Sequence, residues 1–385
     1  PIIGMLSDTY KSNLGLRRFW IILGTPIIMV SVYALFWPRD SITVDSIYLF
    51  FWLLMLTLGW TLILNPYFAL GAEISQNYFE RSRVTFFRET FALVGTILAA
   101  VLFSLGKESV YGMEYITMFV LFSLPSCSLL CVYFVTENID AKLVPERLNP
   151  LRALVAMKLE PMFIRLLLAY FINGAANGLP ATLFIFFVNQ RLNAPLLAGP
   201  LLLIYFGAAV LLMPLWLKLS KRLPKHKLWC YAMVYASIVF LFTIFIGSGD
   251  IYYFVIICFL SGAALSVDLA IPSSIQADLI DVETLSGGKK RTSTFFSFWS
   301  IATKGAIALS SGLSFLVLSK VGFETTGTNT DIALGTLTIL YAVVPIVLKF
   351  LAIGLMWNFK LDRSYQESIQ KKLRKFMIHG YFREI

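Results

Sequence analysis

Long apolar segments constrain this chain more than any other feature of its sequence. Ten stretches carry almost no charge, and each is near the length of about 20 residues that an α-helix needs to cross a bilayer. They run approximately over 19–37, 46–72, 85–105, 114–136, 161–189, 195–217, 228–247, 251–277, 294–319 and 333–357. A transmembrane barrel would instead alternate apolar and polar residues in runs of about ten. The sequence therefore predicts an all-α polytopic membrane protein with ten visible helices.

The composition agrees with that class. Of the 385 residues, 58% are hydrophobic and 14% are charged, whereas soluble domains have about 45–50% and 25%. The four cysteines lie within apolar runs, where we interpret them as small hydrophobic filler. The two histidines are far apart, and no metal cluster, nucleophile–base pair or phosphate loop stands out. We therefore predict that the protein is not an enzyme and has no cofactor other than a coupling ion, H⁺ or Na⁺.

The distribution of Lys and Arg predicts an orientation in the membrane. One set of connections comprises 1–18, 73–84, 137–160, 218–227, 278–293 and the tail from 358. The other set contains only four of the 32 basic residues, namely Arg39, Lys107, Arg191 and Lys320. Cytoplasmic loops carry an excess of Lys and Arg, so we expect the first set, and the C-terminus, to face the cytoplasm across a plasma or bacterial inner membrane. The net charge of +10 reflects this bias rather than binding to nucleic acid.

The chain divides into two helical parts and a tail. We expect a first part over 1–136, a central cytoplasmic loop with a short surface helix over 137–160, a second part over 161–358 and a tail over 359–385. The parts hold four and six spans. Because the chain begins with Pro1, we expect that two helices precede it, which would make two six-helix halves. Residues 1–18 would then be a polar cytoplasmic loop between the second and third helices. The tail reads as an amphipathic helix that anchors to acidic lipid.

Internal echoes support two related halves. Residues 4–18 and 214–227 are both short basic loops that close a helix pair. Residues 65–83 and 271–291 both run from an intramembrane proline through an acid into a basic loop. Repeated halves around a central site are common in secondary transporters.

Three motifs carry a resemblance to a known family. They are PIIGMLSDTYKSNLGLRRFW at the start, PYFALGAEI followed by ERSRVTFFRETFALVG, and ADLIDVETLSGGKKRTSTFFSFWSIATKG. In this order they resemble the major facilitator superfamily, and within it the glycoside–pentoside–hexuronide:cation symporters, the melibiose-permease-like group. The resemblance covers essentially the whole chain. It implies a major facilitator fold of twelve helices, without the first two here, and cation-coupled symport of a sugar or glycoside by alternating access.

The resemblance also implies site residues. Thr61 matches a threonine of the family's cation site, Arg88 matches a sugar-binding arginine, and Lys304 matches a lysine near the cation site. Leu64 stands where the family has an acid, and Phe68 stands where it has a sugar-stacking tryptophan. These two departures keep a carrier of lysolipid or another amphipathic solute open as an alternative. The family's two further cation-site aspartates would precede Pro1.

Charges inside the apolar segments provide further candidates. Asp268 is the only acid well inside a predicted span, and intramembrane acids are functional by default. We interpret it as a coupling or substrate-binding carboxylate, with a structural pair to Lys304 or Lys349 as the alternative. Lys304 is a cation-site or substrate-binding candidate, or else satisfies carbonyls of a neighbouring helix. Lys349 is interpreted as structural or as snorkelling toward the interface.

Uncharged polar groups and Arg88 are candidates for substrate binding. Asn173 and Asn177 share a helix face, and their amides, with that of Asn65, could bind hydroxyls. The alternative is hydrogen bonding between helices, worth about 1 kcal/mol each. For Arg88 the alternative to a sugar contact is an interfacial ion pair with nearby acids such as Glu89.

A set of charges at the predicted cytoplasmic helix ends resembles the superfamily's gate, which latches the two halves when the carrier faces outward. Its members are Asp8, Arg17, Arg18, Glu73, Arg81, Asp278, Asp281 and Arg291. The sequence thus predicts a monomeric carrier whose partners are a small solute, expected to be a sugar, and the bilayer. A non-transporting membrane receptor is the alternative class.

Overall fold

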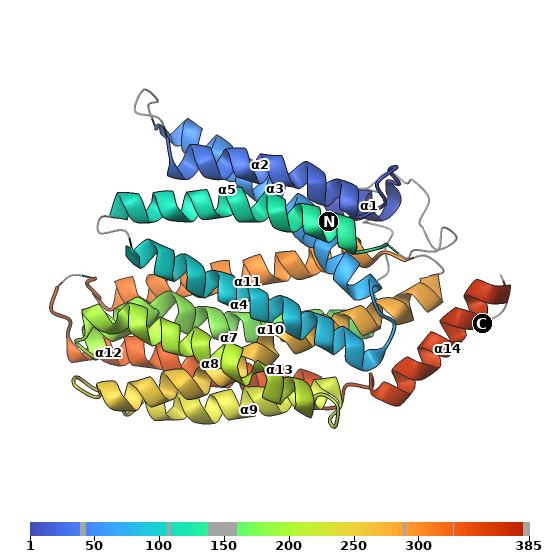
Figure 1. Ribbon diagram of the computed structural model, residues 1–385. Helices are drawn as coiled ribbons and strands as arrows, with labels where there is room; N and C mark the ends of the chain where they lie inside the picture. The colour runs from blue at the N-terminus through green and yellow to red at the C-terminus, as the bar shows by residue number, and fades with distance from the viewer. Residues whose placement is uncertain (39–43, 106–108, 138–159, 288–289, 326, 380–385) are drawn as a thin grey trace.

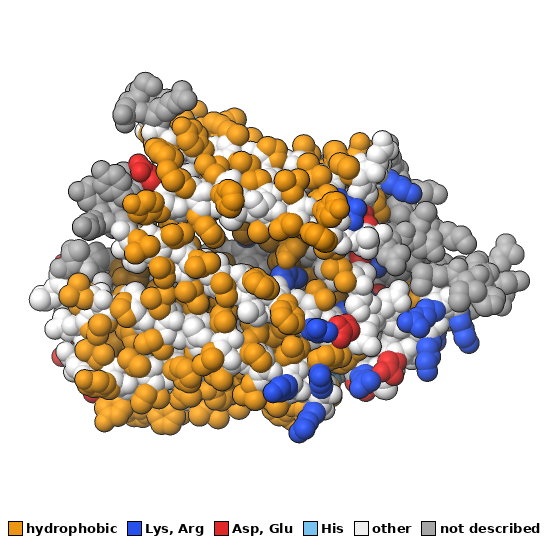
Figure 2. Space-filling model, in the orientation of Figure 1, with side chains coloured by type: hydrophobic (Ala, Val, Ile, Leu, Met, Phe, Trp, Pro, Cys, Tyr) orange, Lys and Arg blue, Asp and Glu red, His pale blue; other side chains and the backbone are white. Residues whose placement is uncertain are grey.

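The computed structural model describes residues 1–38, 44–105, 109–137, 160–287, 290–325 and 327–379. Ten of its helices are long and apolar enough to cross a membrane, in agreement with the predicted number. The predicted surface helix within 137–160 lies outside the described residues. Large apolar side chains such as Phe122 and Tyr252 are exposed on the helices, and hydrophobic side chains cover most of the visible face (Figure 2). That surface is suited to lipid rather than water.

The first bundle contains five helices among the described residues. They are α1 (Ile2–Thr9), α2 (Arg18–Phe36), α3 (Ser46–Glu73), α4 (Tyr78–Leu105) and α5 (Ser109–Phe134). The stretch 1–18 was expected to be a polar loop, but its first part is the helix α1. Gly4 explains why it packs: a Cβ there would lie 2.7 Å from the carbonyl oxygen of Ser293, so only glycine lets α1 approach α11 this closely.

The second bundle is formed by the rest of the chain. Its elements are α7 (Pro161–Phe186) with the π-helical turn η2 (Phe187–Arg191), the 3₁₀ turn η3 (Pro195–Leu197), α8 (Ala198–Leu219), α9 (Lys225–Thr243), α10 (Ile251–Gly287), α11 (Thr292–Lys320) and α12 (Asp331–Thr338), which continues through the π turn η4 (Ile339–Val343) into α13 (Val344–Met356). The amphipathic tail helix is confirmed as α14 (Arg363–His379).

The two bundles lie side by side (Figure 1). Helix α4 packs against α8 and α10, and α11 packs against α1 and α3. The turns at 10–17, 74–77 and 220–224, together with α14, gather at one end of the molecule, on the right in Figure 1. Lys and Arg side chains concentrate there on the visible face (Figure 2). We call it the basic end, and the other the opposite end.

Helix α10 is longer than the sequence predicted. We expected the span to stop at 277 and a loop to follow, yet the helix continues to Gly287. The reason is electrostatic: Asp278 and Asp281 are buried and find cationic partners on other helices. Their charges are compensated inside the protein, so the chain has no need to leave the helix to hydrate them.

Candidate functional site

A buried ion pair lies inside the membrane-spanning region of the second bundle. The Lys349 ammonium on α13 is 3.0 Å from a carboxylate oxygen of Asp268 on α10, and both side chains are buried. Asp268 stands near the middle of its 37-residue helix. A buried charge is costly unless an opposite charge and hydrogen bonds compensate it. Each of the two residues therefore needs the other to compensate its buried charge.

Neutral side chains complete the surroundings of this pair. The Lys349 ammonium donates to the amide oxygens of Asn173 and Asn177 on α7, at 2.9 and 2.8 Å. Asn177 also donates to Asp268 at 3.1 Å, and the indole N–H of Trp229 on α9 donates to the other Asp268 oxygen at 2.8 Å. All three donors of the lysine are thus used. We call Asp268, Lys349, Asn173, Asn177 and Trp229 the charged cluster.

A cavity of about 410 Å³ ends at the charged cluster. It is lined by α7, α8, α9, α10, η4 and α13, with Asn177, Asp268 and Lys349 at one end. The rest of its wall is mostly apolar and includes the aromatic rings of Phe184, Phe240, Phe254 and Tyr341. Small-molecule sites commonly enclose about 300–1,000 Å³ and combine apolar walls with a few polar groups. The arrangement has the size and chemistry to hold a small solute.

The structure corrects two expectations about the intramembrane lysines. Lys349 is the partner of Asp268, so its interpretation as a snorkelling side chain is wrong. Lys304 was the other partner considered for Asp268, but it is exposed on α11 and forms no ion pair within the described part of the chain. Its role near a cation stays a prediction.

Arg88 and Phe68 lie where the two bundles meet. The Arg88 guanidinium carbon is 4.1 Å from the centre of the Phe68 ring. Arg88 pairs with Glu89 at 2.7 Å and donates to the hydroxyl of Ser273 on α10 at 3.0 Å. Phe68 meets Phe296 of α11 edge-on, with 5.7 Å between ring centres. The ion pair with Glu89 exists, so a solute that binds Arg88 must compete with it.

The remaining candidates of the first bundle lie on α3. Asn65 is buried, and neither atom of its amide has a hydrogen-bond partner among the described residues. Unpaired buried polar groups are uncommon and often mark a missing water or ligand. Thr61 donates to the carbonyl of Thr57 at 2.7 Å. A groove of about 780 Å³ opens nearby between α2, α3, α4 and α5, with Leu64 in its wall, and Figure 2 shows the surface hollowed there.

Arg81 joins the two bundles at the basic end. From α4 it pairs with Asp278, at 3.0 Å, and with Asp281, both on α10. Asp278 also pairs with Lys225 of α9 at 2.5 Å. The side chains of Arg81 and of both aspartates are almost completely buried. The contact is therefore a buried charge network, unlike the individually weak ion pairs of an exposed surface.

Asp8 makes a second connection between the bundles. Its carboxylate pairs with Arg17 at 2.7 Å and accepts from the backbone N–H groups of Ser293 and Thr294 at 3.0 and 2.8 Å. These N–H groups belong to the first turn of α11, where the helix dipole favours a negative charge. Arg17 also pairs with Glu73 at 2.9 Å, which ties α3 to the same network.

Two of the predicted gate residues lie at the margin of these networks. Arg18 donates its backbone N–H to Glu137 at 2.8 Å and its guanidinium to the carbonyl of Val135, so its partners lie within the first bundle. Arg291 is half-buried immediately before α11. Among the residues that the structure describes, neither bridges the two bundles through an ion pair.

Nearly the whole chain matches a known family of transporters. The family model described as "MFS/sugar transport protein", where MFS denotes the major facilitator superfamily, matches residues 1–363. The chain belongs to this family. It is 24% identical to the sodium-dependent lysophosphatidylcholine symporter 1 of Gallus gallus, over 97% of this chain and 79% of that protein. It is 23% identical to the uncharacterized symporter YjmB of Bacillus subtilis, over 96% of this chain and 83% of that protein.

Solved structures show the same fold. A bacterial homologue of the iron transporter ferroportin in an outward-facing state has a TM-score of 0.66 at 15% identity, over 91% of this chain and 85% of that one. The transporter FucP in the outward conformation has a TM-score of 0.65 at 14% identity, with the same coverage. The protein is therefore a multi-pass membrane transporter of the major facilitator superfamily rather than an enzyme. The melibiose-permease-like subgroup stays a prediction.

Several residues of the site were missed by sequence reasoning. Lys349 was considered only as structural, with a pair to Asp268 as one alternative, or as snorkelling, and Trp229 and Lys225 were not considered. A signal for Lys349 existed: Pro345, Lys349, Ala352 and Met356 are buried at a helical spacing. That spacing places the lysine on the packed face, where snorkelling is impossible. Nothing comparable marked Trp229, whose indole is apolar in every respect except the one N–H that Asp268 accepts.

Proposed function

We propose that the protein is a cation-coupled symporter of a sugar or glycoside that works by alternating access, with Asp268 as the coupling carboxylate. One observation carries the proposal: a buried Asp268–Lys349 pair stands at the end of a cavity large enough for a small solute. Positive-inside bias favours a cytoplasmic basic end. The buried networks of Arg81 and Asp8 at that end support a state closed toward the cytoplasm.

The charged cluster suggests how cation and solute would be linked. In the structure the carboxylate and the ammonium compensate each other. A proton or Na⁺ at Asp268 would leave the Lys349 charge without its partner, and the two asparagine oxygens alone satisfy it poorly. A solute oxygen would then accept a hydrogen bond from the Lys349 ammonium in place of the neutralised carboxylate. Each ligand then raises the affinity for the other, which is the reciprocal coupling that symport needs.

An amphipathic solute is the second candidate. The cavity wall is mostly apolar, with phenylalanines at 184, 240 and 254. Phe68 offers less polar surface than a tryptophan, and relatives from several vertebrates are named as lysophosphatidylcholine symporters. A phosphate oxygen of a lysolipid would suit Lys349 as well as a sugar hydroxyl does.

Uptake into proteoliposomes separates these candidates. The purified chain is reconstituted, a proton or Na⁺ gradient is imposed, and accumulation is measured for a panel of glycosides and for lysophosphatidylcholine. We expect gradient-driven accumulation that Asp268→Asn abolishes, while exchange of solute without a gradient persists. Asp331→Asn, an exposed position at the start of α12, is the matched control and should leave accumulation unchanged.

Three results would contradict parts of the proposal. Accumulation of lysolipid but of no glycoside would replace the sugar by the amphipathic solute. Accumulation that is insensitive to either gradient would exclude cation coupling. Unchanged accumulation in Asp268→Asn would remove Asp268 from the coupling step.

A further inference from the structure

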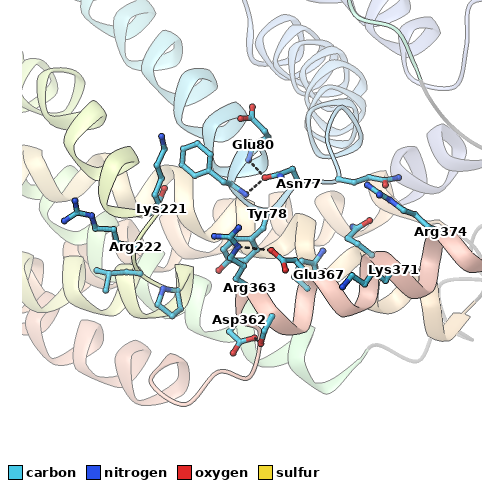
Figure 3. A pocket seen from close by; sticks show the side chains of 18 residues that line it. Asn77, Tyr78, Glu80, Lys221, Arg222, Asp362, Arg363, Glu367, Lys371 and Arg374 are labelled. Atoms are coloured by element: carbon cyan, nitrogen blue, oxygen red, sulfur yellow. Dashed lines mark hydrogen bonds and ion pairs between the residues drawn. The ribbon is translucent and has the colours of Figure 1, made fainter.

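A polar pocket of about 790 Å³ lies at the basic end, separate from the charged cluster (Figure 3). Three segments line it: residues 76–80 at the end of the α3–α4 turn and the start of α4, residues 220–224 from the α8–α9 turn, and residues of α14 preceded by Asp362. The first segment belongs to the first bundle and the second to the second bundle. A molecule bound here would contact both bundles and the C-terminal helix at once.

Positive charge is in excess on the pocket wall. Three acidic side chains line it, against five basic ones, which are Lys221, Arg222, Arg363, Lys371 and Arg374. Lys221 lies 4.7 Å from the ring centre of Phe79. Within the described ranges, Arg222, Lys371 and Arg374 have no carboxylate in ion-pair contact. Cations that surround a concave surface without carboxylate partners create a positive potential that attracts anions.

The acidic residues of the pocket are already engaged. Glu367 pairs with Arg363 at 2.8 Å, as Figure 3 shows, and Glu80 pairs with Arg83 at 3.4 Å. Asp362 accepts from the backbone N–H of Tyr365 at 2.8 Å, and this bond holds the pKa of its carboxyl below the ordinary value. The acids therefore satisfy groups of their own and leave the other cations available.

Helix α14 is fixed to the contact between the bundles. The side-chain amides of Gln366 and Gln370 both donate to the Asp281 carboxylate, which also forms an ion pair with Arg81 of the first bundle. Ile369 and Leu373 are buried against the same end. The position of the cations on α14 is thus tied to the closed arrangement of the basic end.

We propose that this pocket binds a molecule that carries phosphate groups and that the bound molecule holds the basic end closed. Phosphate matches the wall better than a single carboxylate because it offers several charged oxygens to cations from three segments. Arginine in particular binds phosphate through paired N–H groups. The phosphate could belong to a soluble anion or to the headgroup of an acidic lipid beside the bundle.

The effect on transport rests on the proposed alternating access. Opening the basic end separates residues 76–80 from 220–224, since these segments belong to different bundles. A ligand that contacts both stabilises only the closed state and so slows turnover. Binding itself does not depend on that mechanism, and we test it directly.

The test uses tripolyphosphate as the probe and the full chain in nanodiscs of neutral lipid. Binding is measured by titration for the wild type and for three variants with one charge removed: Arg222→Gln, Lys371→Gln and Lys372→Gln. Lys372 is the matched control, because it is exposed on the same helix next to Lys371 but does not line the pocket. We expect saturable binding that Arg222→Gln and Lys371→Gln each weaken about fivefold. Lys372→Gln should change it by less than about twofold.

Two results would overturn the proposal: no saturable binding to the wild type, or equal weakening by all three variants. A second arm identifies the source of the phosphate. If acidic lipid in the nanodisc abolishes tripolyphosphate binding to the wild type, the lipid headgroup is the ligand, and if binding persists, the ligand is soluble. If this binding pattern holds but neither the wild type nor any of the three variants takes up solute, the result counts against the transport proposal and not against the pocket.

Discussion

Single residues in the membrane interior show how strongly this structure couples charges. Lys349 has three hydrogen-bond acceptors and Asp268 is held by a lysine, an amide and an indole. Both side chains are buried, so neither charge is open to bulk solvent. The cluster stabilises the second bundle when it is complete. Under the proposed function it would have a second role, because a cation or solute at either residue would change its charge balance.

Replacing Lys349 should test the first role. Lys349→Met leaves the Asp268 carboxylate buried without a counter-charge, and breaking a buried pair in this way costs about 3–5 kcal/mol. We expect a large decrease in the thermal unfolding temperature of the purified protein in detergent. Lys304→Met removes the same charge from an exposed position and should change the unfolding temperature little. Equal decreases in the unfolding temperature for the two substitutions would show that the buried pair adds no more stability than an exposed lysine does.

The two lysines also show what the sequence could and could not reveal at this scale. An apolar segment identifies a polar or charged group that is out of place, and on that basis Asp268, Asn173 and Asn177 were predicted as candidates, which the structure brings into one cluster. It does not say which helices are neighbours. The choice between Lys304 and Lys349 depends on α13 packing against α7 and α9 while the Lys304 side of α11 stays exposed. That information is tertiary, and the sequence pattern contains it only weakly.

At the scale of whole elements, helix number and class were predictable and helix ends were not. Apolar length alone identified all ten spans. The ends of α10 and α14 instead depend on contacts. Helix α10 passes its predicted end because Asp278 and Asp281 meet Arg81 and Lys225. Helix α14 is attached to the bundle through two glutamines spaced one turn apart, a polar face that an amphipathic pattern alone assigns to solvent.

The start of α14 offers a test at this scale. Asp362 caps the helix by accepting from the Tyr365 N–H, and loss of such a cap costs about 1 kcal/mol. Asp362→Ala should therefore speed amide hydrogen exchange in the first turns of α14. Asp362→Asn retains an accepting oxygen and should largely preserve protection. Unchanged exchange in the alanine variant would show that docking on Asp281, not the cap, holds the helix.

The same cap predicts a pH dependence. The Tyr365 N–H, followed by the Ser364 hydroxyl, lowers the pKa of Asp362 in the folded protein below its ordinary value of 3.8. A carboxyl with a lowered folded pKa stabilises the fold above its ordinary pKa, and the contribution is lost as the pH falls through the lowered value. The protection factors in the first turns of α14, which are exchange rates corrected for the intrinsic effect of pH, should thus fall in acid for the wild type. Asp362→Ala should lack this loss of protection in the same segment.

At the scale of the whole molecule, the two bundles are joined at the basic end by charges that are buried rather than exposed. Arg81 supplies the cation from one bundle, and α10 of the other supplies both acids. Asp8 reaches the first turn of α11 from the other side of the contact. Opening this end must hydrate all of these groups, and alternating access requires that the open and closed states differ by only a few kcal/mol. The networks should therefore set the position of that equilibrium.

Arg81→Gln tests this directly. The substitution leaves Asp278 with Lys225 but removes the charge that holds Asp278 and Asp281 to the first bundle. The loss of one partner from a buried network, about 3–5 kcal/mol, is enough to shift a balanced equilibrium toward the open state. Spin labels on the turns 74–77 and 220–224 should then report a longer distance. Arg83→Gln is the matched control, since Arg83 is exposed on the same helix and pairs only with Glu80 among the described residues, and it should leave the distance as in the wild type. The same distance in both variants and the wild type would mean that apolar packing between α4, α8 and α10, and not Arg81, keeps the basic end closed.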